Sequence, residues 1–321
     1  MKTPSFWNKA NLISSLLLPA GWIYSGLTAL RLKLKKCRKV SVPVICIGNL
    51  TAGGTGKTPT AVSIAKILKK QGKNPFFVSR GYGGKLHNTI VDKEHHTAAD
   101  VGDEPLILAE EAPVSVNPDR YRAAAAAERQ GADVIIMDDG FQNPSLCKDL
   151  SFIVIDGGFG FGNRRPVPSG PLRENLKAGL KRADAVLLIG KDRFNLAESF
   201  GELPVFTGQI IPETKNLPPQ TKPVIAFAGI GRPEKFYESL SKLGYSLLKT
   251  KDFPDHHFYT ETELEQLINQ AQKAEAILFT TSKDIVKIPP RLRKQFHVLE
   301  ITVAWDKPET LSVFINRKLL F

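Results

Sequence analysis

Cysteine is scarce in this chain of 321 residues, and acidic residues are absent from its first 40. The three cysteines, Cys37, Cys46 and Cys147, lack the paired spacing of disulfide frameworks and zinc sites. We therefore expect no disulfide and no zinc site, as is usual in a reducing compartment. Internal repeats and low-complexity tracts are also missing. The ordinary hydrophobic fraction of 42% and charged fraction of 24% predict a folded globular protein, and the length favours about two domains.

The lack of acidic residues near the start of the chain explains most of its net charge of +12. Residues 1–40 hold eight Lys and Arg, whereas the other 281 residues hold 36 basic and 32 acidic residues. The eight are Lys2, Lys9, Arg31, Lys33, Lys35, Lys36, Arg38 and Lys39. Positive charge gathered in one terminal segment is typical of contact with an anionic lipid surface. We therefore expect a membrane surface as a partner and no nucleic acid, and no segment indicates an obligate protein partner.

Residues 10–30 contain no charge over 21 positions. A helix of about 20 apolar residues can reach across a bilayer, and Trp22 and Tyr24 are of the type found at membrane interfaces. Pro19 would weaken a straight helix, so a kinked or half-inserted segment is the alternative to a spanning one. A cleaved signal peptide is a further alternative, which the glycine-rich loop described next argues against, and a buried core helix fits poorly with the basic residues that follow. Residues 1–40 are thus expected to form a membrane stem, with the rest of the chain on the cytoplasmic side.

Gly53, Gly54 and Gly56 stand between an apolar run at 44–47 and a helical pattern at 60–70. A strand, a glycine-rich turn and a helix in this order form a phosphate-binding loop, whose N–H groups point at one anion. Lys57 would add a charge at the β- and γ-phosphates of ATP, and the hydroxyl of Thr58 would ligate Mg²⁺. Thr51 stands where the usual pattern has a glycine. The expected ATP-binding residues are Thr51, Ala52, Gly53, Gly54, Thr55, Gly56, Lys57 and Thr58.

Acidic residues end another apolar run, at 132–139. An acid at the carboxyl end of a strand near a phosphate-binding loop holds Mg²⁺, directly or through water. Asp138 and Asp139 are therefore candidate metal residues, and the alternative is a simple capped strand end. Asp103 and Glu104 begin a predicted helix, where negative charge also suits the helix dipole.

Predicted strands and helices alternate from residue 42 to about 190, which is typical of a doubly wound, mostly parallel sheet. Proline-rich residues 212–223 predict a linker, after which the alternation starts again. We therefore expect an α/β fold of the P-loop NTPase type. Its parts would be the stem at 1–40, a phosphate-loop domain at 41–211, the linker, and a smaller α/β domain at 224–321.

Eight short motifs give the chain a resemblance to one family. They are GNLTAGGTGKTP at 48–59, SRGYGG at 79–84, GDEP at 102–105, DDGFQN at 138–143, PSGPLRE at 168–174, FAGIGRPEKF at 227–236, FPDHH at 253–257 and TSKD at 281–284. In this order and spacing they resemble the tetraacyldisaccharide 4'-kinases, membrane-associated kinases of lipid A biosynthesis, over most of the chain. The resemblance implies transfer of the γ-phosphoryl group of ATP to the 4'-hydroxyl of a tetraacylated glucosamine disaccharide 1-phosphate, with Mg²⁺, at the bacterial inner membrane. Thr51 is then a feature of the family rather than a departure.

The resemblance also implies roles for individual residues. Asp103 and His256 would form a base dyad that accepts the proton of the hydroxyl, because a carboxylate raises the basicity of an imidazole that it binds. Their separation in the chain means that the two domains would have to close over the substrate. Glu104 would join Asp138 and Asp139 in arranging Mg²⁺ and its waters.

Further side chains are candidates for contacts with phosphates or with the lipid, since guanidinium groups suit phosphate. They are Arg80, Tyr82, Arg120, Asn143 and Arg173, and for the arginines the alternative is a solvated surface position. Asn143 takes the place of a histidine that is usual in the family, and we expect a supporting role that an amide can fill. Residues 281–284 resemble the base-reading loops of other phosphate-loop proteins and would lie near adenine, unless they form an ordinary turn.

Two other functions are compatible with parts of the sequence. A membrane-anchored phosphate-loop nucleotide switch, which recognises a protein partner, would use the stem and residues 281–284. Such a switch does not require the glycine and proline motifs at 79–84 and 168–174. A soluble kinase for a small metabolite leaves the uncharged N-terminal segment unexplained.

Overall fold

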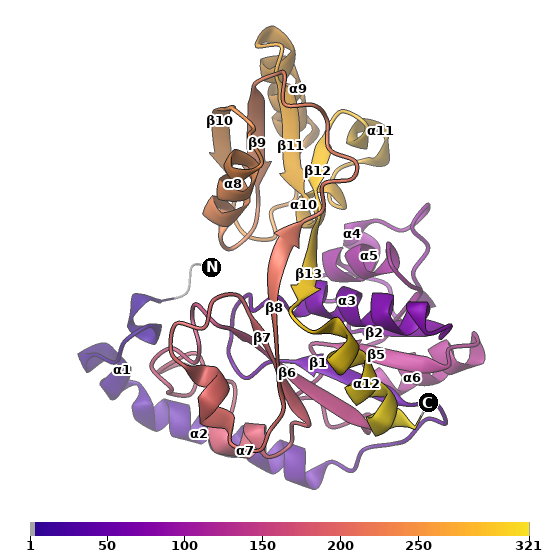
Figure 1. Ribbon diagram of the computed structural model, residues 1–321, viewed down its shortest axis with the longest axis vertical. Helices are drawn as coiled ribbons and strands as arrows, with labels where there is room; N and C mark the ends of the chain where they lie inside the picture. Colours follow the sequence, from indigo (N-terminus) through magenta and orange to yellow (C-terminus); the bar gives the residue numbers. More distant parts are fainter. Residues whose placement is uncertain (1–3, 321) are drawn as a thin grey trace.

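Two β-sheets, one large and one small, form the two domains of the protein (Figure 1). The computed structural model describes residues 4–320, so residues 1–3 and 321, and with them Lys2, lie outside the described residues. Within the described part of the chain, the large sheet has nine strands in the order β13-β8-β7-β6-β1-β5-β2-β4-β3. The small sheet has four strands in the order β10-β9-β11-β12.

Short apolar runs that are buried on both faces form the centre of the large sheet. The strands are β1 (Val44–Gly48), β2 (Pro75–Ser79), β3 (Thr89–Ile90), β4 (Val114–Val116), β5 (Val134–Asp138), β6 (Leu150–Asp156), β7 (Ala185–Ile189), β8 (Val205–Pro212) and β13 (Ile301–Trp305). The pairs β3–β4 and β8–β13 at the two edges are antiparallel, and the central pairs are parallel. The expected mostly parallel sheet is therefore confirmed.

Helices cover both faces of the large sheet. Ile45 and Ile47 of β1 belong to the apolar core that also contains side chains of α3 (Lys57–Lys70), α5 (Asp103–Ala109) and α12 (Pro308–Leu319). Val44 and Cys46 belong to the core on the other face, with α6 (Arg120–Arg129) and α7 (Leu176–Leu180). Each fully buried aliphatic side chain of this size contributes about 1.5–3 kcal/mol through burial. The alternation along β1 thus fixes one strand between two helical layers.

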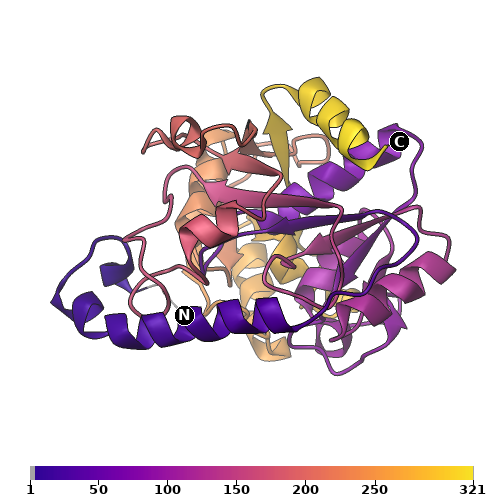
Figure 2. The ribbon, with the colours of Figure 1, turned by 90° about the horizontal axis from the view of Figure 1, so that it is seen from below.

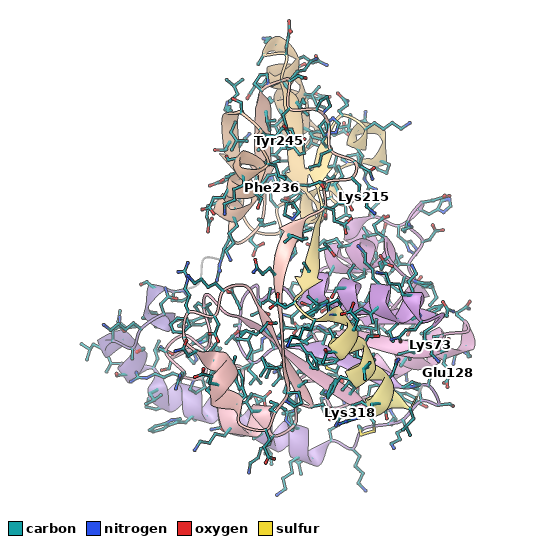
Figure 3. The ribbon with its side chains drawn as sticks, in the orientation of Figure 1. Lys73, Glu128, Lys215, Phe236, Tyr245 and Lys318 are labelled. Atoms are coloured by element: carbon teal, nitrogen blue, oxygen red, sulfur yellow. A yellow bond between two sulfur atoms is a disulfide. The ribbon has the colours of Figure 1, made fainter. Side chains whose placement is uncertain are left out.

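The small domain repeats this plan with an all-parallel sheet. Its strands are β9 (Val224–Ala228), β10 (Leu247–Asp252), β11 (Ile277–Thr281) and β12 (His297–Leu299). One face packs on α8 (Pro233–Lys242) and the other on α9 (Glu261–Lys273). Phe236 and Tyr245, labelled in Figure 3, are buried in this domain. Short helices complete the chain: η1 (Ser5–Trp7), α4 (Ala98–Val101), η2 (Leu196–Phe200), α10 (Ser282–Ile285) and α11 (Pro290–Arg293).

The chain crosses between the domains twice, and here the structure differs from the expected boundary. After β12 it returns to the large sheet as β13, followed by α12, so residues 301–319 do not belong to the small domain, in contrast to the expected range of 224–321. The reason is that β13 pairs with β8, a contact between distant segments that local alternation of strands and helices does not reveal. A two-stranded ribbon of β8 and β13 therefore joins the domains (Figure 1).

The N-terminal segment forms two helices, α1 (Leu12–Leu16) and α2 (Leu18–Leu34), and α2 runs along one edge of the large domain (Figure 2). Gly21 lies against the body, where a Cβ atom would come within 3.0 Å of Cγ of Pro166. Arg165 donates hydrogen bonds to the hydroxyl groups of Ser14 and Ser15, at 2.9 Å and 3.0 Å. The outward faces expose large apolar side chains, among them Leu12, Leu16, Trp22, Ile23, Leu27 and Leu30.

None of the helices within residues 4–320 combines the length and the apolar character that a bilayer crossing requires. The uncharged run at 10–30 is divided between α1 and α2, and α2 continues into the basic residues Arg31 and Lys33. Of the two forms of stem considered from the sequence, the spanning one is therefore wrong for the described residues.

Cys37 and Cys147 form a disulfide, so the expectation that the chain has none is wrong. The backbone brings the two cysteines together, because Arg38 N–H donates to Ser145 O at 3.0 Å and Cys147 N–H donates to Arg38 O at 3.0 Å. Their spacing could not reveal this pairing, since 110 positions separate them in the sequence. The disulfide ties the end of the stem to the loop that follows β5.

Candidate active site

The glycine-rich loop connects β1 to α3 at the carboxyl edge of the large sheet. Gly56 immediately precedes α3 with a φ of 82°, a left-handed conformation that glycine adopts without strain. The buried side chain of Asn49 stabilises the loop, since its amide donates to Thr51 O at 2.7 Å and to Thr55 Oγ1 at 3.1 Å. The start of α3 is thus presented by a preformed loop, which favours an anion at that point.

The loop also rests on the segment at 171–173. Ala52 N–H donates to Pro171 O at 2.7 Å, and Thr51 forms an isolated antiparallel bridge with Leu172. Thr51 is buried, whereas Gly53 and Gly54 are exposed. A β-branched residue suits the extended, buried start of the loop. Thr51 therefore occupies a position where glycine is not required.

Lys57 and Thr58 lie opposite the acids at the end of β5. Thr58 Oγ1 donates to Asp138 Oδ2 at 3.1 Å, and Lys57 Nζ lies 3.6 Å from Asp139 Oδ1. Arg173 Nη1 donates to the same oxygen of Asp139 at 2.8 Å. Burial lowers the pKa of Lys57 although the charge of Asp139 opposes it. Burial would raise the pKa of Asp139, but the charges of Lys57 and Arg173 outweigh it and hold that pKa below its usual value.

Asp138 is the acid that has free capacity to bind a cation. It is buried, and its Oδ1 has no hydrogen-bond partner among the described residues. Burial raises the pKa of Asp138 to about 7, and the negative charge of Glu104 adds to this effect. Closely grouped hydroxyl and carboxylate oxygens fit a hard cation such as Mg²⁺. Thr58 and Asp138, with Glu104 close by, therefore fit the expected Mg²⁺ ion. Asp139, in contrast, is already paired with the cationic side chains of Lys57 and Arg173.

Arg120 is a buried cation whose Nε and Nη1 have no hydrogen-bond partner within residues 4–320. Its exposed fraction is 5%, so the alternative of a solvated surface arginine is wrong for this residue. Burial lowers the pKa of Arg120 to about 10, and the neighbouring charge of Arg80 contributes, while Asp138 and Asp139 act in the opposite direction. A buried guanidinium without a partner is costly unless an anion joins it. Its surroundings therefore fit a phosphate group.

Asp103 and His256 meet across the boundary between the two domains. Asp103 begins α5 in the large domain, and His256 lies in the loop after β10 in the small domain. Oδ2 of Asp103 and Nδ1 of His256 are 2.8 Å apart, although 153 positions separate the residues. Because an ionised carboxylate only accepts hydrogen bonds, Nδ1 carries the hydrogen, which leaves Nε2 able to accept a proton.

The surroundings of the two side chains strengthen this contact. The hydrogen bond that His256 donates to Asp103 raises the pKa of His256, against the opposing effect of burial. Burial would raise the pKa of Asp103, but the hydrogen bond and charge of His256, with the charges of Lys283 and Lys287, lower it. His256 has a φ of 60°, which is uncommon for a residue other than glycine, and its N–H donates to Gly229 O at 3.2 Å. The loop therefore holds this residue in a conformation that the chain would not adopt freely.

Three predicted residues lie further out. Tyr82 is 71% exposed, and the guanidinium of Arg80 lies 5.8 Å from the centre of its ring. Asn143 Oδ1 accepts hydrogen bonds from the N–H and the hydroxyl of Ser145, at 2.9 Å and 2.8 Å. In this structure the amide of Asn143 thus shapes the turn after the acids of β5.

The segment at 281–284 turns its acid inward. Asp284 is fully buried and accepts hydrogen bonds from Thr281 Oγ1 at 2.7 Å, from Tyr259 Oη at 2.8 Å and from Gly229 N–H at 3.1 Å. The buried Lys287 pairs with the same carboxylate at 2.9 Å. These contacts fasten the loops after β9 and β11 to each other, which favours the ordinary strand-to-helix turn over a base-reading loop.

Sequence reasoning missed several residues that organise the site. The amide of Gln142 donates to Asn49 O at 2.8 Å and to Glu174 Oε1 at 2.9 Å, and Glu174 also pairs with Arg182. Gln142 and Glu174 lie inside the motifs at 138–143 and 168–174, so those motifs held the available signal.

A second missed contact joins the domains through Asp156 and Arg232, whose Oδ2 and Nη1 atoms are 3.1 Å apart. The signals for this pair were an acid at the end of a strand and a basic residue in the motif at 227–236.

A glycine-rich loop follows the central strand of the sheet, and acids end the strand beside it. This arrangement is that of the α/β proteins with a phosphate-binding loop. The sequence profile of the family described as Tetraacyldisaccharide-1-P 4'-kinase matches residues 13–320. The tetraacyldisaccharide 4'-kinase of Paramagnetospirillum magneticum is 46% identical over 321 residues, which cover 99% of this chain and 98% of the relative. That of Rhodospirillum rubrum is 44% identical, with 100% of this chain and 98% of the relative covered.

A solved structure agrees with the sequence comparisons. LpxK from Aquifex aeolicus, crystallised in complex with ATP, is similar with a TM-score of 0.80 and 30% identity, over 96% of this chain and 100% of that chain. The chain therefore belongs to the tetraacyldisaccharide 4'-kinase family and is a kinase.

Proposed function

We propose that this protein transfers the γ-phosphoryl group of ATP to the 4'-hydroxyl of a tetraacylated glucosamine disaccharide 1-phosphate, a step of lipid A biosynthesis. Membership of the family supports the reaction. The observation that carries it is the 2.8 Å contact between His256 Nδ1 and Asp103 Oδ2. Glu104 follows Asp103, and its negative charge acts to raise the pKa values of Asp138 and Lys57. The dyad therefore lies close to the glycine-rich loop. A hydroxyl acceptor needs a base at this place, and a nucleotide switch does not.

In this proposal the chain positions the two substrates and moves one proton. His256 Nε2 accepts the proton of the 4'-hydroxyl while the hydroxyl oxygen forms its bond to the γ-phosphorus. The bond between that phosphorus and the β–γ bridging oxygen breaks, and ADP leaves. Asp103 orients the imidazole through Nδ1 and stabilises the positive charge that it gains. Lys57, Arg120 and the N–H groups of the loop balance the negative charge of the phosphates.

The metal ion has a defined place in the proposal. Thr58 and Asp138 would hold Mg²⁺, and Glu104 and Asp139 would arrange its waters. When bound, the ion supplies positive charge to the β- and γ-phosphates of the nucleotide. The free buried oxygen of Asp138 supports this assignment, as do the negative charges of Glu104 and Asp139, which help to raise the pKa of Asp138.

We further propose contacts for the lipid side of the reaction. Arg80, Tyr82 and Arg173, exposed or half-buried at the edge of the site, would bind the disaccharide or one of the phosphates. The stem would lie on the cytoplasmic face of the bacterial inner membrane, with the exposed apolar side chains of α1 and α2 among the lipids and the basic residues at 31–39 on anionic headgroups. This position would bring the body to a substrate whose acyl chains stay in the bilayer.

A transfer assay tests the proposal. The full chain, purified in detergent micelles, is given ATP labelled at the γ-phosphate together with the tetraacyl disaccharide 1-phosphate, and the radioactivity of the lipid is followed. We expect transfer that requires Mg²⁺ and that is much weaker with the deacylated disaccharide. A preference for guanine nucleotides and retention of a protein partner, without lipid phosphorylation, would favour a membrane-anchored nucleotide switch instead.

A further inference from the structure

A second charged contact between the domains lies on the other side of the glycine-rich loop from the Asp103–His256 pair. Nη1 of Arg232 is 3.1 Å from Oδ2 of Asp156, and Nζ of Lys235 is 3.9 Å from the same oxygen. Asp156 ends β6, and α5 with Asp103 packs on β2 and β4. In the sheet order β6-β1-β5-β2-β4, the strand β1 that carries the loop therefore stands between the two contacts.

Asp156 is a fixed acceptor. Its side chain is 15% exposed, and Oδ1 accepts a hydrogen bond from Gly158 N–H at 2.9 Å, which leaves Oδ2 for the small domain. Its backbone oxygen accepts from the N–H groups of Phe159 and Gly160, at 3.0 Å and 2.7 Å. The carboxylate is therefore held by a turn that belongs to the large domain, next to the strand that carries the glycine-rich loop.

Arg232 is connected to His256 through the backbone of the small domain. It ends the loop at 229–232, between β9 and α8. Gly229 O of this loop accepts the hydrogen bond from His256 N–H at 3.2 Å, and Phe253 N–H donates to Ala228 O at 2.9 Å. Gly229 N–H in turn donates to the buried carboxylate of Asp284 at 3.1 Å. The loops that carry Arg232 and His256 thus form one unit, and a displacement of the first displaces the second.

We propose that Asp156 and Arg232 form a latch that keeps the small domain closed and so positions His256 on Asp103 during phosphoryl transfer. Neither residue touches the reacting atoms, so both are positioning residues. The inference rests on the proposed function, because it assigns the latch a role in the transfer to the lipid. The two domains are joined covalently by the ribbon of β8 and β13, and charged contacts on both sides of the glycine-rich loop restrict rotation about such a ribbon.

The ion pair of Asp156 and Arg232 is partly exposed to solvent, which limits how much it stabilises the closed arrangement of the domains. The side chain of Arg232 is 43% exposed, and ion pairs of this kind are weak and are screened by salt. A weak latch suits a kinase that must open to release ADP and the phosphorylated lipid. We expect its loss to reduce the closed fraction and kcat by about fivefold rather than to abolish activity.

A double-mutant cycle on the full chain in detergent micelles tests the latch. Asp156→Asn and Arg232→Gln should each lower kcat for the lipid disaccharide by about fivefold, with the KM for ATP unchanged. The double variant should be no slower than Asp156→Asn alone, because Arg232→Gln removes a contact that Asp156→Asn has already removed. Arg232→Lys should recover most of the rate, since it keeps the charge. A high salt concentration should slow the wild type and leave the double variant unaffected.

The pair Asp184 and Lys318 offers a matched control. Lys318 Nζ lies 3.1 Å from Asp184 Oδ1, and Asp184 Oδ2 accepts a hydrogen bond from Ser151 N–H, much as Asp156 is bound on both oxygens. Both residues belong to the large domain, and Figure 3 shows Lys318 on α12, away from Phe236 and Tyr245 of the small domain. Asp184→Asn should leave kcat unchanged.

Amide hydrogen exchange tests the latch independently of the proposed reaction. In the latch variants the segment at 103–109, which lies in the large domain away from the substituted residues, should exchange about fivefold faster than in the wild type and in Asp184→Asn. A wild type that phosphorylates no lipid would overturn the proposed function, while the exchange of this segment would still test the latch. If both single variants kept the exchange rate and the kcat of the wild type, the latch would be overturned. It would also be overturned if the fold loss of kcat in the double variant were the product of the two single losses.

Discussion

At the scale of single residues, His256 gives the proposed mechanism its dependence on pH. Its base form is the neutral imidazole, and the hydrogen bond that it donates to Asp103 raises the pKa of the imidazole above 6.5. The protonated, inactive form therefore persists to a higher pH than for a free histidine. We predict that kcat/KM for the lipid rises with pH through an apparent pKa above 6.5, measured as initial rates from pH 5 to pH 9.

A conservative substitution at Asp103 tests whether its carboxylate sets the pH at which kcat/KM rises. In Asp103→Asn the imidazole loses its anionic partner, so the apparent pKa should fall towards the ordinary value of histidine while the maximal rate drops. His257→Gln serves as the control, because His257 pairs with Glu263 instead. An unchanged apparent pKa in Asp103→Asn would contradict the contact between Asp103 and His256.

A second prediction at this scale concerns the buried ion pair of Asp284 and Lys287. Their side chains are 0% and 1% exposed, and Asp284 also accepts hydrogen bonds from Thr281, Tyr259 and Gly229. Asp284→Asn would leave the ammonium group of Lys287 buried without a counter-charge, which costs about 3–5 kcal/mol. We predict a loss of this order in the free energy of unfolding of the small domain, measured by urea denaturation. The control Glu238→Gln, on the exposed side of α8, should change it by less than about 0.5 kcal/mol.

At the scale of elements, the disulfide anchors the end of the stem to the loop after β5. It closes a segment of 110 residues, and in the chain-entropy view a loop of this size stabilises the folded state by about 4–5 kcal/mol. We predict that reduction, or the change Cys37→Ser, lowers the urea midpoint of the large domain. Thiol titration of the unfolded protein should find one free cysteine, Cys46, before reduction. Three free thiols without a reductant would contradict the pairing.

The helices of the stem lead to a prediction about lipid binding. Trp22 and Ile23 on α2 are 63% and 66% exposed, and burial of such a side chain among acyl chains stabilises the bound state by about 1.5–3 kcal/mol. Trp22→Ser with Ile23→Ser should therefore weaken binding to anionic vesicles by at least about tenfold in a sedimentation assay. Val313→Ser on α12, where Val313 is 63% exposed, is the matched control and should bind as the wild type does. Equal binding of all three proteins would argue against a docking role for α2.

At the scale of the whole molecule, the features that sequence could predict are those with a local signal. The strand, glycine-rich loop and helix at 44–70 follow one another in the chain, and an acid that ends a parallel strand must lie on the same sheet edge as that loop. The grouping of Thr58 with Asp138 could therefore be predicted from residue order alone. The pairing of Asp103 with His256 came from the resemblance to a family and not from any local pattern.

Contacts between distant segments left no local signal. The disulfide, the return of β13 to the large sheet and the pair of Asp156 with Arg232 each depend on how separate segments pack. The burial of Arg120 is of the same kind, because an arginine at the start of a helix is expected on the surface until α6 is packed on the sheet. Tertiary packing therefore decided the parts of the site that sequence reasoning missed.

In the proposed mechanism, the two domains close to place His256 as a base beside the phosphate-binding loop. The most direct test compares kcat for phosphoryl transfer to the tetraacyl disaccharide in the wild type, His256→Gln and the neighbouring His257→Gln. Removal of a general base costs about 10²–10⁴-fold in rate, so we predict a loss of that size for His256→Gln with the dissociation constant for ATP unchanged. His257→Gln should keep nearly all of its activity. Normal turnover in His256→Gln, or equal losses in the two variants, would show that His256 is not the base.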